Sequence, residues 1–257
     1  MNPLPLQGKR ILVTRSASQT AKLSQGLSAL GAIPAEVPVL EIVPPESYAP
    51  LDEALRNLDL FDWLILTSTN TLRAVSVRCA RFGVDPTRAE RLQVAAVGRP
   101  TAEAARLFGF KVAMVPEAQV AESLVAALAE TVRGKRVLLP RAAVARDVIP
   151  DQLRQAGATV DVVDAYRNVL PQAAPGQLRK AMMEGINAAT FTSSSSVTHL
   201  AEAARLAGIA WPFPGVPAVS IGPITSETLR ENGWEPVAEA KPHDIPGLIA
   251  AVGGLFS

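Results

Sequence analysis

The sequence predicts an α/β protein with parallel sheets, and three observations carry this prediction. Short apolar segments alternate with longer segments in which apolar residues recur every three to four positions. This alternation is typical of βαβ units, in which each helix crosses between two parallel strands. The whole pattern occurs twice along the chain. Each copy has four to five expected strands, which favours two flavodoxin-like, doubly wound domains.

The duplication is visible as pairs of similar segments separated by a nearly constant spacing of roughly 125 residues. "RILVTR" in the first half resembles "RVLLPR" in the second, and "LTSTN" falls against "FTSSS". "VAAVGRPTAEAARLFGF" falls against "AVSIGPITSETLRENGW", with Gly98 matching Gly222 and Thr101 matching Thr225. Chance does not explain this constancy, so the sequence predicts a pseudo-duplicated architecture.

The elements of the first half begin with a strand at 11–14 and a helix carrying Leu23, Leu27 and Leu30 on one face. Gly31 ends this helix, since glycine readily adopts the left-handed conformation of a C-terminal cap. The later elements are a strand at 35–43, a strand at 63–67 with its helix, a strand at 94–98 with a helix ending at Gly109, and a strand at 111–115 with a last helix.

The second half begins in the same way, with a strand at 137–140 and a helix carrying Ile149 and Leu153 that ends at Gly157. The elements after it are a strand at 159–166, a strand at 188–192 with its helix, and a strand at 218–222 with a helix ending at Gly233. Near the C-terminus, Asp244 and Pro246 have the spacing of a helix cap and first turn. Trp63, Trp211 and Trp234 are expected to pack in or beside the core.

Proline-rich segments at 43–52 and 170–177 lie at equivalent places within the two repeats, not between them. If they cross between domains, the spatial domains differ from the sequence halves, and one domain is assembled from both ends of the chain. Sequence spacing permits either arrangement.

Composition excludes several classes of function. The 257 residues carry a formal net charge of +1, so no broad basic field suggests nucleic-acid binding. The single cysteine, Cys79, fits a reducing cytosol. The N-terminal residues lack the pattern of a signal peptide, and no apolar segment approaches the roughly 20 residues that span a membrane. His199 and His243 lack the spacing of metal ligands.

Candidate binding residues lie where the expected strands end, because ligands of open α/β sheets bind beyond the carboxyl ends of the strands. They are mostly small, hydroxyl-bearing or glycine, and helix N-termini beside them suit carboxylates and phosphates. The candidates are Thr14, Arg15, Ser68, Asn70, Gly98, Thr101, Arg141, Ser193, Ser194, Gly222 and Thr225. Simple helix capping is the alternative for each hydroxyl. The phosphate motifs GxGxxG and GxxxxGK[ST] are absent, which argues against nucleotide binding.

Charged and aromatic candidates are fewer. Arg15 and Arg141 follow equivalent strands, either as surface charges or as guanidinium groups for a carboxylate. At the position equivalent to Arg99, the other repeat has a proline, so any role of Arg99 is not shared by the two halves. Tyr166 replaces Leu40 of the first repeat at the end of a strand. It is either a half-buried strand tyrosine or a phenol that donates a proton to a departing group.

The segment "FTSSSSV" at 191–197 raises the choice between a flexible linker and a site. Its repeat partner "LTSTNTL" favours a strand-to-helix turn. We expect Ser193 and Ser194 to face the ligand, and Ser195 and Ser196 to begin and cap the helix. His199 follows on this helix, but the absence of GxSxG argues against a hydrolase triad.

Several of these motifs together resemble those of a known protein family. "ILVTR", "DAYR", "FTSSSSV" and "SIGPITSETLRENG" followed by "IPGLIAAV" occur in an order and spacing that resembles the uroporphyrinogen-III synthase family over essentially the whole chain. The resemblance implies two α/β domains joined by a two-stranded linker, the first discontinuous. In this sequence these are 1–41 with 172–257 and 46–165, joined by 42–45 and 166–171.

The resemblance also implies a reaction. The substrate would be hydroxymethylbilane, a linear tetrapyrrole with many carboxylates, and the product uroporphyrinogen III with its terminal ring inverted. The route loses the terminal hydroxyl to give an azafulvene and passes through a spiro intermediate, without cofactor or metal. Tyr166 would help the hydroxyl to leave. A cytoplasmic monomer, supplied by the preceding bilane-forming enzyme, is expected. The competing hypothesis is a non-catalytic two-domain protein that binds or senses a small anion.

Overall fold

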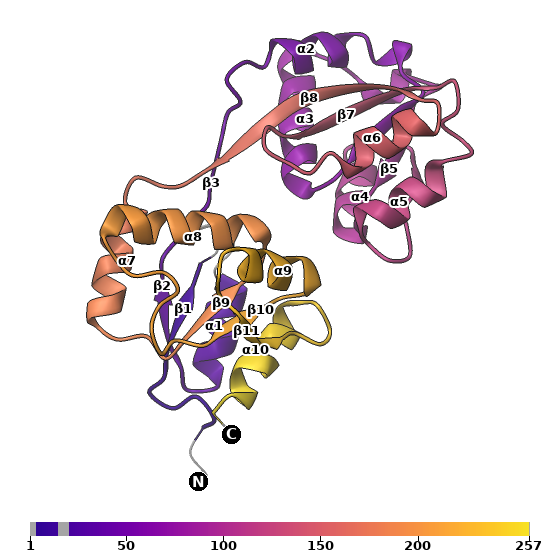
Figure 1. Ribbon diagram of the computed structural model, residues 1–257. Coiled ribbons are helices and arrows are strands. Elements are labelled where there is room, and N and C mark those ends of the chain that lie inside the picture. The colour runs from indigo at the N-terminus through magenta and orange to yellow at the C-terminus, as the bar shows by residue number, and fades with distance from the viewer. Residues whose placement is uncertain (1–3, 15–20, 257) are drawn as a thin grey trace. The chain divides into compact units, whose positions relative to one another are not determined.

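The computed structural model describes residues 4–14 and 21–256, and the chain divides into two compact units. Unit 1 comprises Met1–Glu41 and Val169–Ser257, and unit 2 comprises Ile42–Asn168. The colours of Figure 1 show that unit 1 combines the indigo N-terminal segment with the orange and yellow C-terminal part. One unit is therefore built from both ends of the chain.

Unit 1 contains a five-stranded parallel sheet in the order β11-β10-β9-β1-β2. Its strands are β1 (Arg10–Val13), β2 (Ile33–Glu36), β9 (Ala188–Phe191), β10 (Ala218–Ser220) and β11 (Pro236–Glu239). Its helices are α1 (Ala21–Ala29), α7 (Ala174–Met183), α8 (Ser194–Ala207), α9 (Pro223–Glu231) and α10 (Ile245–Gly254).

Helices cover both faces of this sheet because side chains alternate along each strand. Leu12 points into a core with Leu178 and Leu200 of α7 and α8. Ile11 points the other way, into a core with Leu23 and Leu248 of α1 and α10. The sheet is therefore doubly wound.

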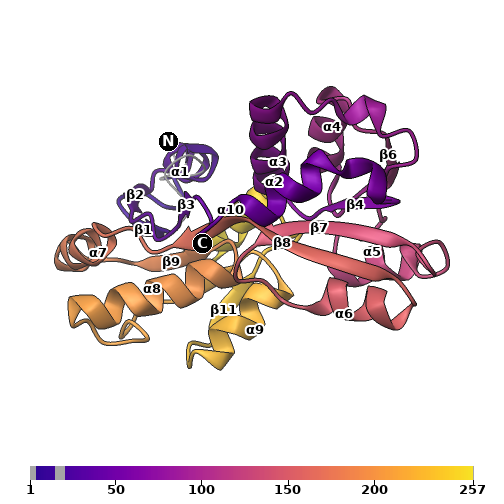
Figure 2. The same cartoon turned by 90° about the horizontal axis from the view of Figure 1, so that it is seen from above.

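Unit 2 contains a six-stranded sheet in the order β3-β8-β7-β4-β5-β6. Its strands are β3 (Glu41–Val43), β4 (Trp63–Leu66), β5 (Gln93–Ala96), β6 (Val112–Met114), β7 (Arg136–Ala142) and β8 (Thr159–Val169). Its helices are α2 (Ala49–Arg56), α3 (Thr69–Phe82), α4 (Arg99–Leu107), α5 (Ala121–Leu128) and α6 (Val148–Gln155), with short 3₁₀ turns at Leu58–Leu60 and Pro86–Arg88. Helices α2, α3 and α4 pack on one face, and α5 and α6 pack on the other (Figure 2).

The two sheets share one strand order, which explains the sequence repeat. Numbered by chain position within unit 1, the strands have the flavodoxin-like order 2-1-3-4-5. In unit 2, β8-β7-β4-β5-β6 gives the same order when β7 takes the place of β1. Each sheet thus takes two strands from the front of one repeat and three from the back of the other, and the unit 2 sheet has β3 as an additional edge strand. The predicted fold class and duplication are confirmed.

Most local predictions agree with the structure. The glycines expected to end helices all have positive φ, with 89° at Gly31, 101° at Gly109, 91° at Gly157 and 77° at Gly233. The Asp244 carboxylate accepts a hydrogen bond from the Gly247 N–H at 2.8 Å and caps α10 as predicted.

The tryptophans pack as expected. Trp63 and Trp234 are buried, and Trp211 packs edge-on against Trp234 while its ring N–H donates to the Asn232 carbonyl at 2.8 Å. They are structural residues.

Two strands differ from the prediction. The expected strand at 35–43 is divided into β2 and β3, because Pro38 lacks the N–H that a continuing ladder needs. Strand β8 continues to Val169, so Tyr166 lies within it and not at its end. None of the described helices is both long and apolar enough to cross a membrane.

Candidate functional site

The carboxyl edge of the unit 2 sheet gathers several predicted site residues. Ser68 follows β4 and Gly98 follows β5, while Arg141 lies near the end of β7. Tyr166 of β8 is paired in register with Ala142, the last residue of β7. Because these strands are neighbours, the topology brings the four residues to one edge.

Tyr166 meets the N-terminus of α3. The side chain is buried, with 9% exposure, and its phenol Oη lies 3.4 Å from Ser68 Oγ. Ser68 caps α3 by accepting a hydrogen bond from the Thr71 N–H at 3.1 Å, and its Oγ also lies 3.1 Å from Thr71 Oγ1. The Tyr166–Ser68 contact is longer than the usual O–H···O distance of about 2.7 Å, so it is weak and leaves the phenol able to bind a ligand.

A pocket of about 210 Å³ lies beside Tyr166. It is lined by Ile42, Val43, Pro44, Tyr48, Asn70, Arg73, Ala74, Val77, Ala165 and Tyr166. Of the predicted binding residues, Asn70 lines this pocket. Tyr48 and Arg73 were not predicted. Arg73 could have been found from its position three residues after Asn70, because residues at that spacing share one helix face.

The Tyr48 ring at this pocket is supported by a buried ion pair. The Arg78 guanidinium lies 4.3 Å from the ring centroid and bonds the Asp52 carboxylate through two contacts of 2.6 and 2.5 Å. Hydrogen bonding to Asp52 raises the pKa of Arg78 above its usual value. This bidentate geometry fixes the wall of the pocket.

Gly98 and Thr101 form the first turn of α4. Gly98 is the N-cap, and a side chain there would bring its Cβ to 3.4 Å from Gln119 Oε1, which accepts a hydrogen bond from the Arg99 N–H. Thr101 is buried, with 5% exposure. At this turn, the Thr101 side chain is therefore largely closed to a ligand.

Arg141 is not the free guanidinium that the sequence suggested. It lies inside β7, and its guanidinium donates to the Asp147 carboxylate at 2.6 Å and the Arg146 carbonyl at 3.1 Å. Its side chain is 15% exposed. The loop that brings Asp147 back to the strand could not be read from spacing alone.

The carboxyl edge of the unit 1 sheet holds the remaining candidates, on the adjacent strands β10, β9 and β1. Thr14 is fully buried, and its hydroxyl donates to the Thr190 carbonyl at 2.9 Å. The Thr190 hydroxyl donates to the Leu12 carbonyl at 2.8 Å. Thr14 therefore ties β1 to β9. Arg15 lies outside the described residues.

The four serines divide differently from the prediction. Ser193 is the N-cap of α8, which begins at Ser194, and the Ser196 N–H donates to Ser193 Oγ at 3.2 Å. The Ser193 N–H donates in return to Ser196 Oγ at 3.3 Å, which completes a capping box. The expectation that Ser195 and Ser196 begin and cap the helix was wrong. A run of identical residues hides the position at which the three-residue spacing of the box starts.

Ser194 and the turn before α9 follow the adjacent strands β9 and β10. Ser194 Oγ accepts a hydrogen bond from the Thr228 hydroxyl of α9 at 2.8 Å. Gly222 is the N-cap of α9, and a Cβ there would approach the His243 ring to 3.4 Å. Thr225 is buried, with 4% exposure. The His243 ring and the buried Thr225 side chain thus pack closely around this turn.

The histidines are held by backbone groups. His199 Nδ1 lies 3.0 Å from the Val39 carbonyl oxygen, and His243 Nδ1 lies 2.8 Å from the Ala240 carbonyl oxygen. Within residues 4–14 and 21–256, no group of three His, Cys, Asp or Glu side chains is placed to hold a metal ion.

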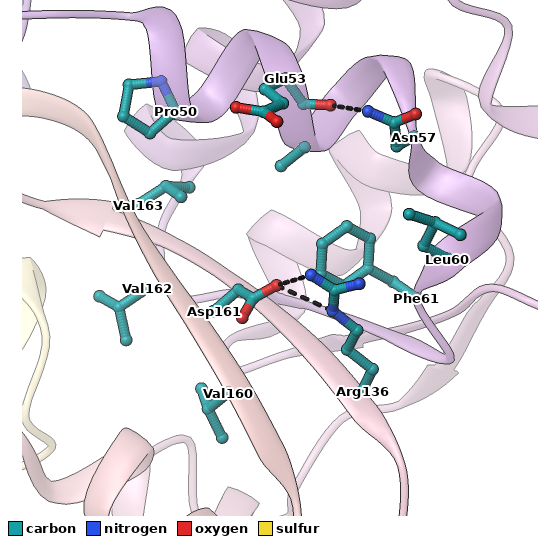
Figure 3. Close-up of a pocket in the computed structure, with 11 residues that line it drawn as sticks. Pro50, Glu53, Asn57, Leu60, Phe61, Arg136, Val160, Asp161, Val162 and Val163 are labelled. Carbon is teal, nitrogen blue, oxygen red and sulfur yellow. Dashed lines mark hydrogen bonds and ion pairs between the residues drawn. The ribbon is translucent and has the colours of Figure 1, made fainter.

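A larger pocket of about 480 Å³ lies near the amino ends of β7 and β4 (Figure 3). Within it, Arg136 and Asp161 face each other, with Arg136 Nη2 2.7 Å from Asp161 Oδ2. The Arg136 guanidinium also lies 4.9 Å from the centre of the Phe61 ring. The charges of Arg136 and Asp161 thus satisfy each other, and the pocket lies at the edge of the sheet where ligands of this fold class seldom bind.

Two doubly wound sheets, each with helix N-termini at its carboxyl edge, define a class. This is a two-unit α/β protein of the kind that binds small ligands beyond the carboxyl ends of its strands. The chain belongs to the uroporphyrinogen-III synthase family. The family model described as uroporphyrinogen-III synthase HemD matches residues 21–250.

Individual relatives agree with this assignment. A uroporphyrinogen-III synthase of Synechococcus elongatus is 37% identical over 253 residues, covering 96% of both chains. A crystal structure of a mutant uroporphyrinogen III synthase from Thermus thermophilus is similar, with 19% identity, a TM-score of 0.68, and coverage of 96% of this chain and 97% of that one. One from Helicobacter pylori has 17% identity, a TM-score of 0.62, and coverage of 97% and 100%. The structural likenesses support the fold. The family predicted from the sequence is confirmed.

Proposed function

We propose that this chain catalyses the uroporphyrinogen-III synthase reaction, which cyclises hydroxymethylbilane to uroporphyrinogen III with loss of water and inversion of the terminal ring. The observation that carries the proposal is the family match over residues 21–250, together with a synthase 37% identical over nearly the whole of both chains. The alternative of a non-catalytic anion-binding or sensor protein is not favoured by these relatives.

Tyr166 is the proposed catalytic residue. Its phenol would donate a hydrogen bond or proton to the terminal hydroxyl of the substrate as that group leaves as water. The resulting azafulvene closes the ring through the spiro intermediate, and the protein holds the chain in a folded pose. The support is the position of the phenol at the carboxyl edge, in a pocket and in weak contact with Ser68.

The other candidates are proposed to bind substrate carboxylates. Ser68, Asn70 and Ser194 would do so through side chains. Where the side chain is engaged or absent, the backbone N–H groups of the helix N-termini would serve. The residues proposed for that second role are Gly98, Thr101, Gly222 and Thr225. Thr14, which follows β1, and Ser193, whose N–H already donates to Ser196 Oγ, are proposed to line the carboxyl edge of the unit 1 sheet. Arg15 and Arg141 remain proposed partners of carboxylates at the rim of the site.

The proposal includes the organisation of the chain. The domains are 1–41 with 172–257 and 46–165, and the linkers are 42–45 and 166–171. The enzyme acts as a cytoplasmic monomer, uses no cofactor or metal, and receives its substrate from the preceding bilane-forming enzyme. A family of small-molecule enzymes and a single buried cysteine are consistent with this description.

Conversion of freshly prepared hydroxymethylbilane by the purified chain tests the function. The products are oxidised to porphyrins and their isomers separated by chromatography, with and without prior treatment of the protein with a chelator. Type III isomer in both samples is expected. Tight binding of the substrate with only the spontaneous type I isomer would overturn the proposal and favour a binding protein.

A further inference from the structure

The side chains that line the pocket beside Tyr166 carry a net positive charge. Arg73 is the ionised side chain among the residues that line it, and no aspartate or glutamate is among them. The other polar groups are the phenols of Tyr48 and Tyr166 and the amide of Asn70. A guanidinium beside several hydrogen-bond donors is the chemistry that binds a carboxylate.

Arg73 has no ion-pair or hydrogen-bond partner in the part of the chain that the structure describes. The nearby Arg78 differs, because its guanidinium is bound to Asp52. Helix α3 places Asn70, Arg73 and Val77 on one face, at spacings of three and four residues. The face that lines the pocket thus presents an unpaired guanidinium.

The remaining walls are apolar, and the volume is small. Ile42, Val43 and Val77 offer surface to a flat ring. The volume of about 210 Å³ lies below the range of roughly 300–1,000 Å³ that encloses whole drug-sized ligands. The pocket therefore suits one substituted ring and its carboxylate, not a whole tetrapyrrole.

We infer that this pocket binds one carboxylate-bearing pyrrole ring of the linear tetrapyrrole, and that Arg73 binds the carboxylate of that ring. This inference rests on the proposed function and adds a binding residue to it. Bidentate pairing with Arg73 would fix the ring against the apolar wall and hold the substrate beside the Tyr166 phenol.

Arg73→Ala tests the inference, with Arg73→Lys as the conservative variant. Arg81→Ala is the matched control, because Arg81 is an exposed arginine of the same helix that does not line the pocket. We measure KM and kcat for hydroxymethylbilane, and binding of uroporphyrin III by its fluorescence. Arg73→Ala should raise KM and weaken porphyrin binding by roughly tenfold or more, with kcat changed less. Arg73→Lys should recover part of the loss, and Arg81→Ala should stay within about twofold.

The outcomes separate the inference from the proposed function. If the wild-type chain makes the type III isomer but Arg73→Ala and Arg81→Ala have the same KM and the same porphyrin affinity, the inference is wrong and the function stands. If the wild-type chain makes only type I isomer, the function is wrong. Loss of porphyrin binding in Arg73→Ala alone would then still support the pocket as a carboxylate site.

Discussion

The phenol oxygen of Tyr166 and the hydroxyl oxygen of Ser68 lie 3.4 Å apart, although Tyr166 lies on β8, Ser68 follows β4, and β7 separates these two strands. Ser68 uses its Oγ to cap α3, so the phenol faces the positive end of a helix. This relationship places the proposed proton donor where an anionic substrate would bind.

Replacing Tyr166 with phenylalanine should slow the reaction without unfolding the chain. The phenol makes a single long contact, so the free energy of unfolding should change by about 1 kcal/mol or less. We expect kcat to fall by roughly tenfold to a hundredfold, since general acid catalysis contributes at least that much and the phenol only assists. Steady-state kinetics and urea unfolding measure both effects, and an unchanged kcat would remove Tyr166 from the mechanism.

Replacing Ser68 with alanine should lower the stability of the chain as well as its affinity for the substrate. The variant loses the N-cap of α3, which costs about 1 kcal/mol. Thr69→Ala is the control, because Thr69 is exposed at the next position of the same turn. Equal urea midpoints for the two variants would contradict the capping role of Ser68.

The serine run allows a direct comparison within one turn. Ser193→Ala removes the cap of α8 and should lower the free energy of unfolding by about 0.5–2 kcal/mol. Ser195→Ala removes a hydroxyl that is not part of the capping box and should have a smaller effect. If Ser195→Ala proves the more destabilising of the two in urea unfolding, the assignment of Ser193 as the cap is wrong.

Asp62 should make stability depend on acid pH. A backbone N–H of Arg136 at 3.0 Å, aided by Lys135 and Arg91, lowers the pKa of Asp62 below its usual value. Its stabilising contribution is therefore complete above the unfolded pKa of about 4 and is lost as pH falls through the lower folded value.

Asp62→Asn should therefore be less stable than wild type at pH 7, and the difference should shrink below about pH 4. Asp59→Asn, which changes an exposed carboxylate nearby, is the control. Urea unfolding across this pH range measures the effect. A difference between Asp62→Asn and wild type that stays constant with pH would contradict the assignment.

The fold could be predicted because its evidence is distributed along the chain. Apolar periodicity, helix-ending glycines such as Gly31 and Gly157, and the repeat spacing all depend on near neighbours or on simple comparison of two halves. The repeat did not show that β8 continues past Tyr166. The proline-rich segment that follows indicates that the chain changes direction there, but it does not indicate at which residue the strand ends.

The site was less predictable because its contacts join distant segments. The partner of Arg141 is on the following loop, and the pocket of Arg73 needs residues 42–44 beside α3. The ends of the expected strands predicted Ser68 and Asn70 as site residues, and the repeat comparison with the family resemblance predicted Tyr166. The sequence could not show which hydroxyls are already bound to the protein.

The isomer composition of the product decides whether this chain directs the cyclisation of hydroxymethylbilane. Purified wild-type chain is mixed with fresh hydroxymethylbilane, and the uroporphyrin isomers are separated after oxidation, beside a protein-free sample that reports spontaneous cyclisation. We expect predominantly type III isomer in the presence of the chain and type I in its absence. The same type I product in both samples would contradict this expectation.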